Sequence, residues 1–469
     1  MKKTALIPID NRPVCYTLPQ MTAAINSDFK LSMPNRKLLG NLTKEADTEA
    51  LFEWLEDLKD VDYLVISSDT LLYGGLIPSR RSSETKEDLD KKILRLRNIL
   101  LNKPNCKTYV FSSIMRISNN NANEEEKEYW SEWGKKIYEY SFNLHKFEVE
   151  GNNSSKERAK ALSAEIPQKI LIDWLSTRSR NFDINKSLLK LYDDGVIDTL
   201  VYSKDDCAQY GLNIKEAKYF EYETANRPRA AVKTGADEIP LALIARCMSD
   251  GHVVKIAPFF TNPESIDKIS NYEDISVKKS VESQIYTAGG DVCDKKDADI
   301  ILYVNNFKDK QGEIVMGEKT EEFSGFLASF DRPSAIADIV NANGSDNKFI
   351  KELFKTKLNG LTGYAGWNTT GNTLGSAISA AMFTHFAKKS KTENTEAFKK
   401  LLAVRFLDDW AYQANLREKI KAENIKDLSM IKELFKPYEE IISKVLSFDC
   451  SNAKYSFPWN RFFEIEIEL

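Results

Sequence analysis

Short apolar runs alternate with amphipathic segments near the start of the chain, and this alternation constrains the fold more than any other feature. Residues 4–9, 62–68 and 107–114 are apolar runs of strand length. Between the second and third runs, residues 84–101 place leucine and isoleucine on one helical face and charged residues elsewhere. A helix between two strands allows the strands to lie parallel, so the pattern predicts an α/β fold with a parallel sheet.

The strand pattern resumes after a largely helical stretch. Further strands are predicted at residues 199–203, 230–233, 252–257, 298–304, 334–337 and 361–365, and helices at 238–248, 277–288, 321–329 and 347–357. The count is eight or nine strands. Eight favours a (β/α)8-type barrel, which we rank first, whereas nine, or a break near Pro258, would suit two doubly wound sheets that meet at a cleft.

The domain organisation follows from where this pattern is interrupted. Residues 1–390 are predicted to form the α/β catalytic domain, with a helical insertion at 118–195. The insertion would be a lid or a substrate wall, or would only cover the core. Residues 391–469 are predicted to form a C-terminal helical segment and an aromatic tail. The tail is expected to pack on the domain, because the aromatic side chains within residues 457–464 would otherwise be exposed to solvent.

Composition excludes several classes of partner. Lys and Arg number 66 against 70 Asp and Glu, with the signs interspersed, so no basic field is available for nucleic acid. No apolar run approaches the roughly 18 residues of a membrane span, and residues 4–9 are too short for a signal peptide. The six cysteines lack CxxC spacing, which favours reduced thiols in a cytoplasmic protein. The sequence does not specify the oligomeric state.

The expected chemistry depends on carboxylates, amides and arginines. Only three histidines occur, and none lies near another or near a cysteine, so a zinc site or a His-based triad has little support. We therefore expect no metal and no cofactor.

Polar side chains follow the predicted strands. Because parallel strands share one carboxyl edge, these side chains would meet at a common rim, where α/β folds bind ligands. The predicted substrate-binding residues are Asp10, Asn11, Arg12, Asp69, Tyr73, Arg116, Asn305, Asp338, Trp367 and Asn368. An indole can cover the apolar face of a sugar, and a neighbouring amide donates and accepts hydrogen bonds. A helix cap or a turn is the alternative for each single residue.

Asp205 and Asp206 are the predicted catalytic residues. Two close carboxylates push their pKa values apart, so one can remain a general acid while the other stays charged. Glycoside hydrolysis uses such a pair, with the charged member acting as nucleophile or orienting the acetamido group of the substrate. The substrate-assisted hexosaminidases resemble this chain in having an Asp-Asp doublet after a mid-barrel strand and a later Trp-Asn pair. A capping or ion-pair role is the alternative for the doublet.

Two further pairs of charged residues are interpreted as structural. Asp237 and Glu238 precede an apolar helix, where Thr234 or Asp237 would cap the helix and Glu238 would interact with its dipole. Arg405 and Asp409 are four residues apart in a predicted helix, which predicts an ion pair.

Five motifs together resemble those of the bacterial domain-of-unknown-function family 4127. They are residues 7–13 (IPIDNRP), 68–76 (SDTLLYGGL), 235–238 (GADE), 366–375 (GWNTTGNTLG) and 458–461 (PWNR). The resemblance spans nearly the whole chain and implies one functional unit rather than a fusion. It implies no particular activity.

The first hypothesis for function is a glycoside hydrolase that acts on a small glycan or glycoconjugate, such as an N-acetylhexosaminide. Asp206 would be the acid/base and Asp205 the orienting carboxylate, or the reverse. A rival is a Mg²⁺- or Mn²⁺-dependent hydrolase or phosphoryl-transfer enzyme with oxygen ligands. Those ligands would be Asp10, Asp69, Asp338 and one member of the doublet. A non-catalytic sugar-binding protein is the third alternative.

Overall fold

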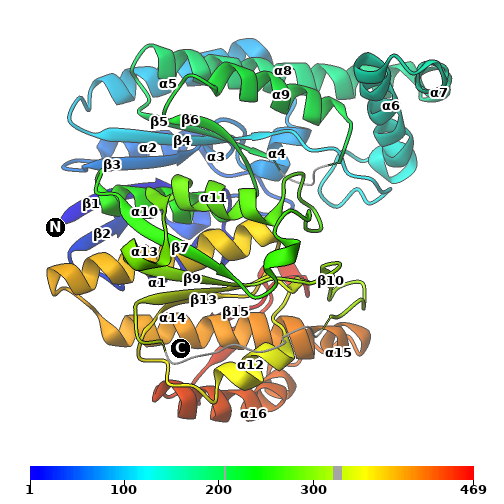
Figure 1. Cartoon of the computed structure of the whole chain (residues 1–469). Helices are drawn as coiled ribbons and strands as arrows, with labels where there is room; N and C mark the ends of the chain where they lie inside the picture. The colour runs from blue at the N-terminus through cyan, green and yellow to red at the C-terminus, as the bar shows by residue number, and fades with distance from the viewer. Residues whose placement is uncertain (205–207, 321–329) are drawn as a thin grey trace. The chain divides into compact units, whose positions relative to one another are not determined.

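The computed structural model of the chain describes residues 1–204, 208–320 and 330–469 (Figure 1). Asp205, Asp206 and the helix predicted at 321–329 lie outside the described residues. The chain divides into two compact units. Unit 1 comprises Met1–Thr4, Arg12–Leu31 and Asp237–Leu469, and unit 2 comprises Ala5–Asn11 and Ser32–Ala236.

The larger sheet belongs mostly to unit 2 and has six strands, in the order β2-β1-β3-β4-β5-β6. These are β1 (Lys2–Ile7), β2 (Phe29–Ser32), β3 (Tyr63–Ser67), β4 (Lys107–Ile114), β5 (Thr199–Lys204) and β6 (Ala230–Thr234). The pairs β3–β4, β4–β5 and β5–β6 are parallel. All residues of β3 and β5 are buried, and each strand contains an apolar run, at residues 63–66 and 200–202.

Several helices connect the strands of this sheet along the chain. They are η1 (Arg36–Leu38), α2 (Thr48–Asp57), α3 (Ser68–Tyr73), α4 (Leu76–Arg81), α5 (Lys86–Leu101) and α9 (Leu212–Thr224). The helix predicted at 84–101 is confirmed as α5, which begins after a Thr85 cap and buries Leu89, Ile93 and Leu96.

Three long helices, α6 (Trp130–Glu150), α7 (Asn153–Glu165) and α8 (Gln168–Asp193), occupy most of the stretch between β4 and β5. This segment has a small apolar core in which Trp130 and Trp174 are almost fully buried. Pro167 directly precedes α8. In Figure 1, α6 and α7 lie together at one end of α8.

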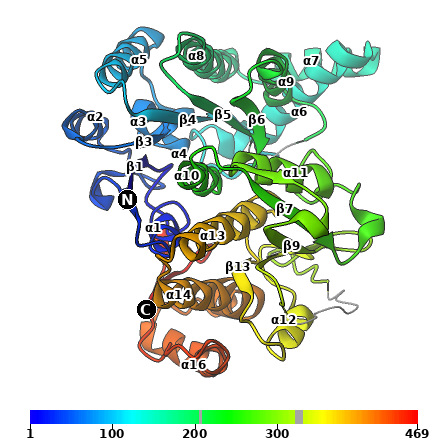
Figure 2. The ribbon, with the colours of Figure 1, turned by 60° about the vertical axis from the view of Figure 1, so that its left-hand side comes forward.

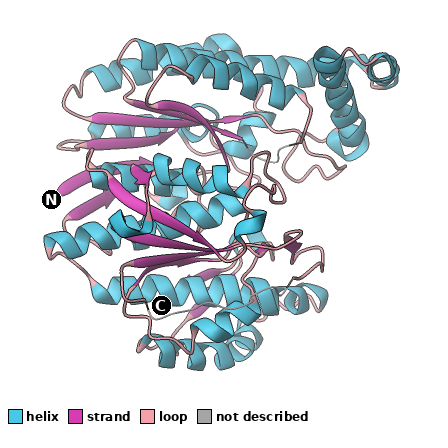
Figure 3. Ribbon diagram, viewed as in Figure 1, coloured by secondary structure: helices cyan, strands magenta, loops and turns pink. Residues whose placement is uncertain are grey.

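The sheet of unit 1 has five strands in the order β13-β11-β9-β7-β8. These are β7 (Val254–Phe260), β8 (Gly290–Val292), β9 (Ile300–Asn305), β11 (Ser334–Asp338) and β13 (Leu361–Ala365). All four pairs are parallel. The strands are drawn in magenta in Figure 3.

Helix α13 (Thr370–Ser390) lies beside β13 and is buried over most of its length (Figure 2). Gly363 makes this close approach possible, because a Cβ there would lie 2.5 Å from the Ala377 carbonyl oxygen. The other elements near the sheet are α1 (Thr17–Ala23), α10 (Ile239–Ser249), η2 (Pro263–Ser265), α11 (Val277–Thr287), η3 (Lys295–Asp297), β10 (Gly312–Glu313), β12 (Asn341–Ala342) and α12 (Asn347–Leu353).

The C-terminal part of unit 1 contains α14 (Thr395–Arg405), the π-helical segment η4 (Phe406–Leu416), α15 (Arg417–Ala422), α16 (Leu428–Leu446), β14 (Lys454–Ser456), η5 (Pro458–Asn460) and β15 (Glu466–Glu468). Its aromatic tail packs back onto the unit. The ring centroids of Phe463 and Trp367 are 5.7 Å apart. The Tyr412 hydroxyl donates a hydrogen bond to the Phe462 carbonyl.

All nine predicted strands are present, and they are divided between the two larger sheets. The α/β class and the parallel sheets are therefore confirmed. A closed barrel, the architecture ranked first, is not seen in the described part of the chain. Pro258 lies inside β7 and does not interrupt it.

Candidate functional site

Two neighbouring strand ends in unit 1 bring predicted residues together. The Asn305 side-chain amide, at the end of β9, donates to Asp338 Oδ1 at the end of β11 over 2.9 Å. The other oxygen of Asp338 accepts the backbone N–H of Asp346 at 2.8 Å. Burial raises the pKa of Asp338 well above its usual range, and nearby Asp346 raises it further. Asp338 is fully buried, so this arrangement fixes the loop after β11 and offers no open surface to a substrate.

Trp367 and Asn368 follow β13. The Asn368 carbonyl accepts the backbone N–H of Asn343 at 2.8 Å. Trp367 is only 4% exposed, and among the described residues its Nε1–H has no hydrogen-bond acceptor. It borders a pocket of about 20 Å³ whose polar lining includes Arg405, Asp408 and Glu464. That volume admits a group about the size of one water molecule. Stacking of Trp367 on a sugar stays a prediction.

Arg405, Asp408 and Asp409 lie close to the motif of residues 366–375, which contains Trp367. The predicted Arg405–Asp409 ion pair is confirmed, and Asp409 also accepts the backbone N–H of Gly366 at 2.7 Å. Arg405 also pairs with Asp408 at 3.2 Å. Burial raises the pKa of Asp408 to about 7 against the opposing effect of Arg405, and Asp409 adds to the increase. Asp408 was missed in the sequence, where its position next to the predicted ion pair was the one signal.

Arg12 joins three of the sequence motifs within unit 1. Its guanidinium contacts Asp237 at 2.6 Å and Glu464 at 3.0 Å, and lies 5.3 Å from the centre of the Trp459 ring. All three charged residues are buried. The prediction that Thr234 or Asp237 caps the following helix was wrong, because Glu238 occupies the cap position. The Asp237 carboxylate pairs with Arg12 instead. A buried guanidinium attracts a carboxylate more strongly than a helix end does.

Glu238 is a fully buried acid between three helices. Its Oε1 accepts a hydrogen bond from Gln284 at 2.7 Å, while Oε2 has no partner among the described residues. It packs against Gly375, where a Cβ would lie 2.4 Å from the Glu238 Cγ. Burial raises the pKa of Glu238 to about 8, and nearby Glu273 adds to the increase. A raised pKa favours the protonated form of Glu238 at neutral pH.

The substitution Glu238→Gln is expected to flatten the pH dependence of stability. The pKa of Glu238 is higher in the folded state, about 8, than its ordinary value, so its stabilising effect is full below about pH 4.5 and is lost as the pH rises to 8. Relative to the variant, the wild type should lose up to about 4 kcal/mol of unfolding free energy between pH 5 and pH 8. Urea unfolding at several pH values measures this difference.

The control for this experiment is Glu264→Gln, at an exposed glutamate in the same unit. A difference between wild type and Glu238→Gln that does not change with pH would contradict a protonated Glu238.

The strand ends of unit 2 carry a second polar network. Asp69, in the first turn of α3, accepts the backbone N–H of Ser113 at 2.8 Å. Burial raises the pKa of Asp69 to about 6, although the Ser113 hydrogen bonds and the charge of Arg80 lower it. Tyr73 ends the same helix, and the Arg180 guanidinium lies 5.4 Å from its ring centre. Asp10 is buried, and the Asn11 carbonyl accepts a hydrogen bond from Arg36 at 2.9 Å.

Arg116 links the end of β4 to the loop that follows. It pairs with Glu125 at 2.8 Å, and its Nε lies 3.6 Å from Glu126. Arg80 lies 3.5 Å from the same Glu126 oxygen, which also accepts the Ser118 hydroxyl at 3.1 Å. Glu126 thus connects two arginines near the strand ends and also borders an open pocket.

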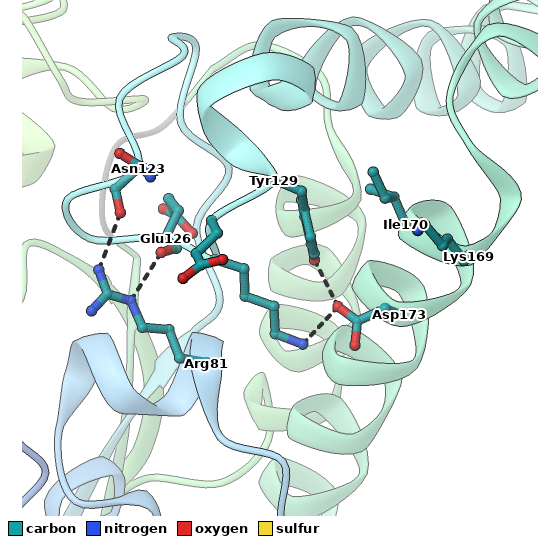
Figure 4. A pocket seen from close by; sticks show the side chains of 9 residues that line it. Arg81, Asn123, Glu126, Tyr129, Lys169, Ile170 and Asp173 are labelled. Carbon is teal, nitrogen blue, oxygen red and sulfur yellow. Dashed lines mark hydrogen bonds and ion pairs between the residues drawn. The ribbon is translucent and has the colours of Figure 1, made fainter.

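That pocket has a volume of about 680 Å³ and lies between the end of α4, the loop before α6 and the first turns of α8 (Figure 4). It is lined by Arg81, Asn123, Glu126, Lys127, Glu128, Tyr129, Lys169, Ile170 and Asp173. Asp173 Oδ2 accepts hydrogen bonds from Lys127 at 2.7 Å and from the Tyr129 hydroxyl at 2.9 Å. The Arg81 guanidinium donates to backbone carbonyls, including those of Leu42 and Glu126.

The ten predicted substrate-binding residues are divided equally between the units. Unit 2 holds Asp10, Asn11, Asp69, Tyr73 and Arg116, and unit 1 holds Arg12, Asn305, Asp338, Trp367 and Asn368. The proposed catalytic doublet, Asp205 and Asp206, is not among the described residues. Within the described ranges, no three or more acidic, histidine or cysteine side chains form a metal-binding group. In the same ranges, every helix is too short or too polar to cross a membrane.

Parallel sheets with polar strand ends place this chain among the α/β proteins. A family model described as "Protein of unknown function (DUF4127)" matches residues 4–468. The chain belongs to this family, as its five motifs predicted. A search of curated proteins found no match.

Proposed function

We propose that the protein is a glycoside hydrolase that acts on a small glycan or glycoconjugate, such as an N-acetylhexosaminide. The observation that supports this most is the open pocket of about 680 Å³ in unit 2, which combines an aromatic ring with carboxylates, amines and an amide. Ligand pockets typically measure about 300–1,000 Å³, so one or two sugar units would fit. Carboxylates and amides suit the hydroxyl groups of a sugar.

The proposed chemistry uses the Asp205–Asp206 doublet, which falls within the sequence span of the same unit. Protonated Asp206 gives its proton to the glycosidic oxygen as the bond from that oxygen to the anomeric carbon breaks. Charged Asp205 orients the acetamido group, whose carbonyl oxygen attacks the anomeric carbon. Asp206, now a carboxylate, then takes a proton from the water that attacks the same carbon and releases the sugar.

A panel of exo- and endo-type chromogenic glycosides, assayed with and without EDTA, tests the proposal. We expect turnover of at least one substrate, unchanged by EDTA. Activity that EDTA abolishes would favour the metal-dependent hydrolase instead. Sugar binding without turnover would favour a non-catalytic binding protein.

Asp173→Asn is expected to raise KM about tenfold with little change in kcat, because weakening one charged hydrogen-bond acceptor costs about 1.4 kcal/mol. Asp173 holds both Lys127 and Tyr129 in place, so its charge organises one wall of the pocket. Steady-state kinetics on the best substrate of the panel measures the effect.

Asp183→Asn is the matched control, since Asp183 is on the same helix and pairs with Lys186 away from the pocket lining. Equal KM values for Asp173→Asn and the wild type would show that the substrate does not bind in this pocket.

A further inference from the structure

Glu238 and Gln284 form a buried side-chain pair where three helices of unit 1 meet. Glu238 directly precedes α10, Gln284 lies in α11, and both lie against Gly375 of α13. A Cβ at Gly375 would lie 2.4 Å from Glu238 Cγ and 3.1 Å from Gln284 Oε1, so the absence of a side chain there leaves room for the pair. The three helices pack against one another around it.

The pair leaves two buried oxygens unfilled. Gln284 Nε2–H donates to Glu238 Oε1 at 2.7 Å, but neither Glu238 Oε2 nor Gln284 Oε1 has a hydrogen-bond partner among the described residues. The exposed fraction is 0% for Glu238 and 3% for Gln284, so water does not reach them from the surface. Two acceptors cannot bond to each other, and burying both without a donor is costly.

One proton would fill both oxygens. A protonated carboxyl group and a primary amide can join through two hydrogen bonds, one from the amide N–H and one from the acid O–H to the amide oxygen. The first of these bonds is present between Gln284 and Glu238. The atoms of the second bond, Glu238 Oε2 and Gln284 Oε1, are the two that lack partners.

The neighbouring acids oppose a charge on Glu238. Burial is the main cause of its raised pKa, and Glu273 and Asp237 raise the pKa further. Both acids are held in place by donors of their own, since Glu273 accepts the backbone N–H of Gly371 at 2.7 Å and Asp237 pairs with Arg12 at 2.6 Å.

The basic side chains of the three helices are directed elsewhere. In α10, Arg246 donates to the Thr287 carbonyl at 2.9 Å. In α11, Lys278 and Lys279 are exposed, and both lysines of α13 lie in its last turn. A carboxylate at Glu238 would therefore be buried with no basic side chain of α10, α11 or α13 to balance it.

We propose that a proton on Glu238 Oε2 joins Glu238 and Gln284 in a cyclic acid–amide pair, and that loss of this proton is a pH-sensitive switch in the packing of α10, α11 and α13. With the proton, two hydrogen bonds cross between the helices. Without it, Glu238 Oε2 and Gln284 Oε1 repel each other, and the start of α13 opens more readily. The switch connects the motifs at residues 235–238 and 366–375 and does not depend on glycosidase activity.

Infrared spectroscopy of the full chain in D2O tests for the proton. A protonated carboxyl group has a carbonyl band separate from that of a carboxylate, so the wild-type spectrum minus that of Glu238→Gln isolates the band of Glu238. We expect the acid band at pH 6 and its loss at pH 9. In Gln284→Met the band should move to higher frequency, because the hydrogen bonds to the amide are lost.

Two infrared results would overturn the proposal. One is a wild type without an acid band from Glu238 at pH 6, a result that needs only the wild type and Glu238→Gln and stands even if Gln284→Met does not fold. The other is an acid band at the same frequency in the wild type and Gln284→Met, because Gln284 would then not accept the proton.

Hydrogen exchange tests the switch. Between pH 6 and pH 9, the protection factors of amides in α11 and in the first half of α13 should fall at least tenfold in the wild type, after correction for intrinsic exchange. Glu238→Gln is neutral at both pH values and should show no such fall, whereas Glu264→Gln, at an exposed glutamate of unit 1, should behave like the wild type. Circular dichroism checks that each protein stays folded. No fall in the wild type, or an equal fall in Glu238→Gln, would overturn the switch.

Discussion

Replacing Asp206 with asparagine is expected to lower kcat on any glycoside that the protein hydrolyses by at least about 10³-fold, within the range that general acid–base catalysis contributes. Asparagine matches aspartate in shape but can neither give a proton to the glycosidic oxygen nor take one from water. Binding of the sugar should remain measurable, because the walls of the pocket are unchanged. Single-turnover kinetics and calorimetric binding separate these two effects.

Asp205→Asn distinguishes the roles within the doublet. If Asp205 orients the acetamido group, its variant should lose activity most strongly on substrates that have this group. Asp194→Asn is the control, since Asp194 forms an exposed ion pair with Lys190 at the end of α8. Full activity in both doublet variants would remove the catalytic assignment, even if the protein proves to be a hydrolase.

Replacing Arg12 with methionine is expected to reduce the free energy of unfolding by about 3–5 kcal/mol, the usual effect of breaking a buried ion pair. The variant would leave Asp237 and Glu464, both buried, without the guanidinium that holds them at 2.6 and 3.0 Å. Urea unfolding followed by circular dichroism measures the change.

Arg95→Met provides a comparison at the surface. Arg95 also contacts two glutamates, Glu49 and Glu56, each at 2.8 Å, but these side chains are substantially exposed. Exposed ion pairs contribute about 0–1 kcal/mol, so this variant should differ little from the wild type. If both variants lost the same stability, burial of the Arg12 network would have no special effect.

The strands could be predicted because a buried strand has a recognisable local composition. Strands buried on both faces read as continuous apolar runs, and residues 107–114 and 361–365 form strands with the predicted bounds. Strands of two or three residues, such as β8 and β10, give no comparable signal. The division into two sheets depends on which strands pair over long sequence distances, and local patterns carry no information about that.

The strand-end residues were only partly predictable for a related reason. Asn305 and Asp338 do meet, because β9 and β11 pair in parallel and end together. Residue type alone did not reveal that Asp338 is fully buried or that burial raises the pKa of Glu238. Those properties arise from neighbours far along the chain, such as Gln284 and Asp346.

The contact between Arg12 and Glu464 also affects the order in which the chain can fold during synthesis. The two residues are 452 positions apart, so Arg12 leaves the ribosome long before its partner exists. Unit 2 uses residues no later than Ala236 and can gather its strands while translation continues. Within unit 1, Arg12 can form its ion pair with Glu464 only after the aromatic tail has been synthesised, so this buried network is completed late in translation.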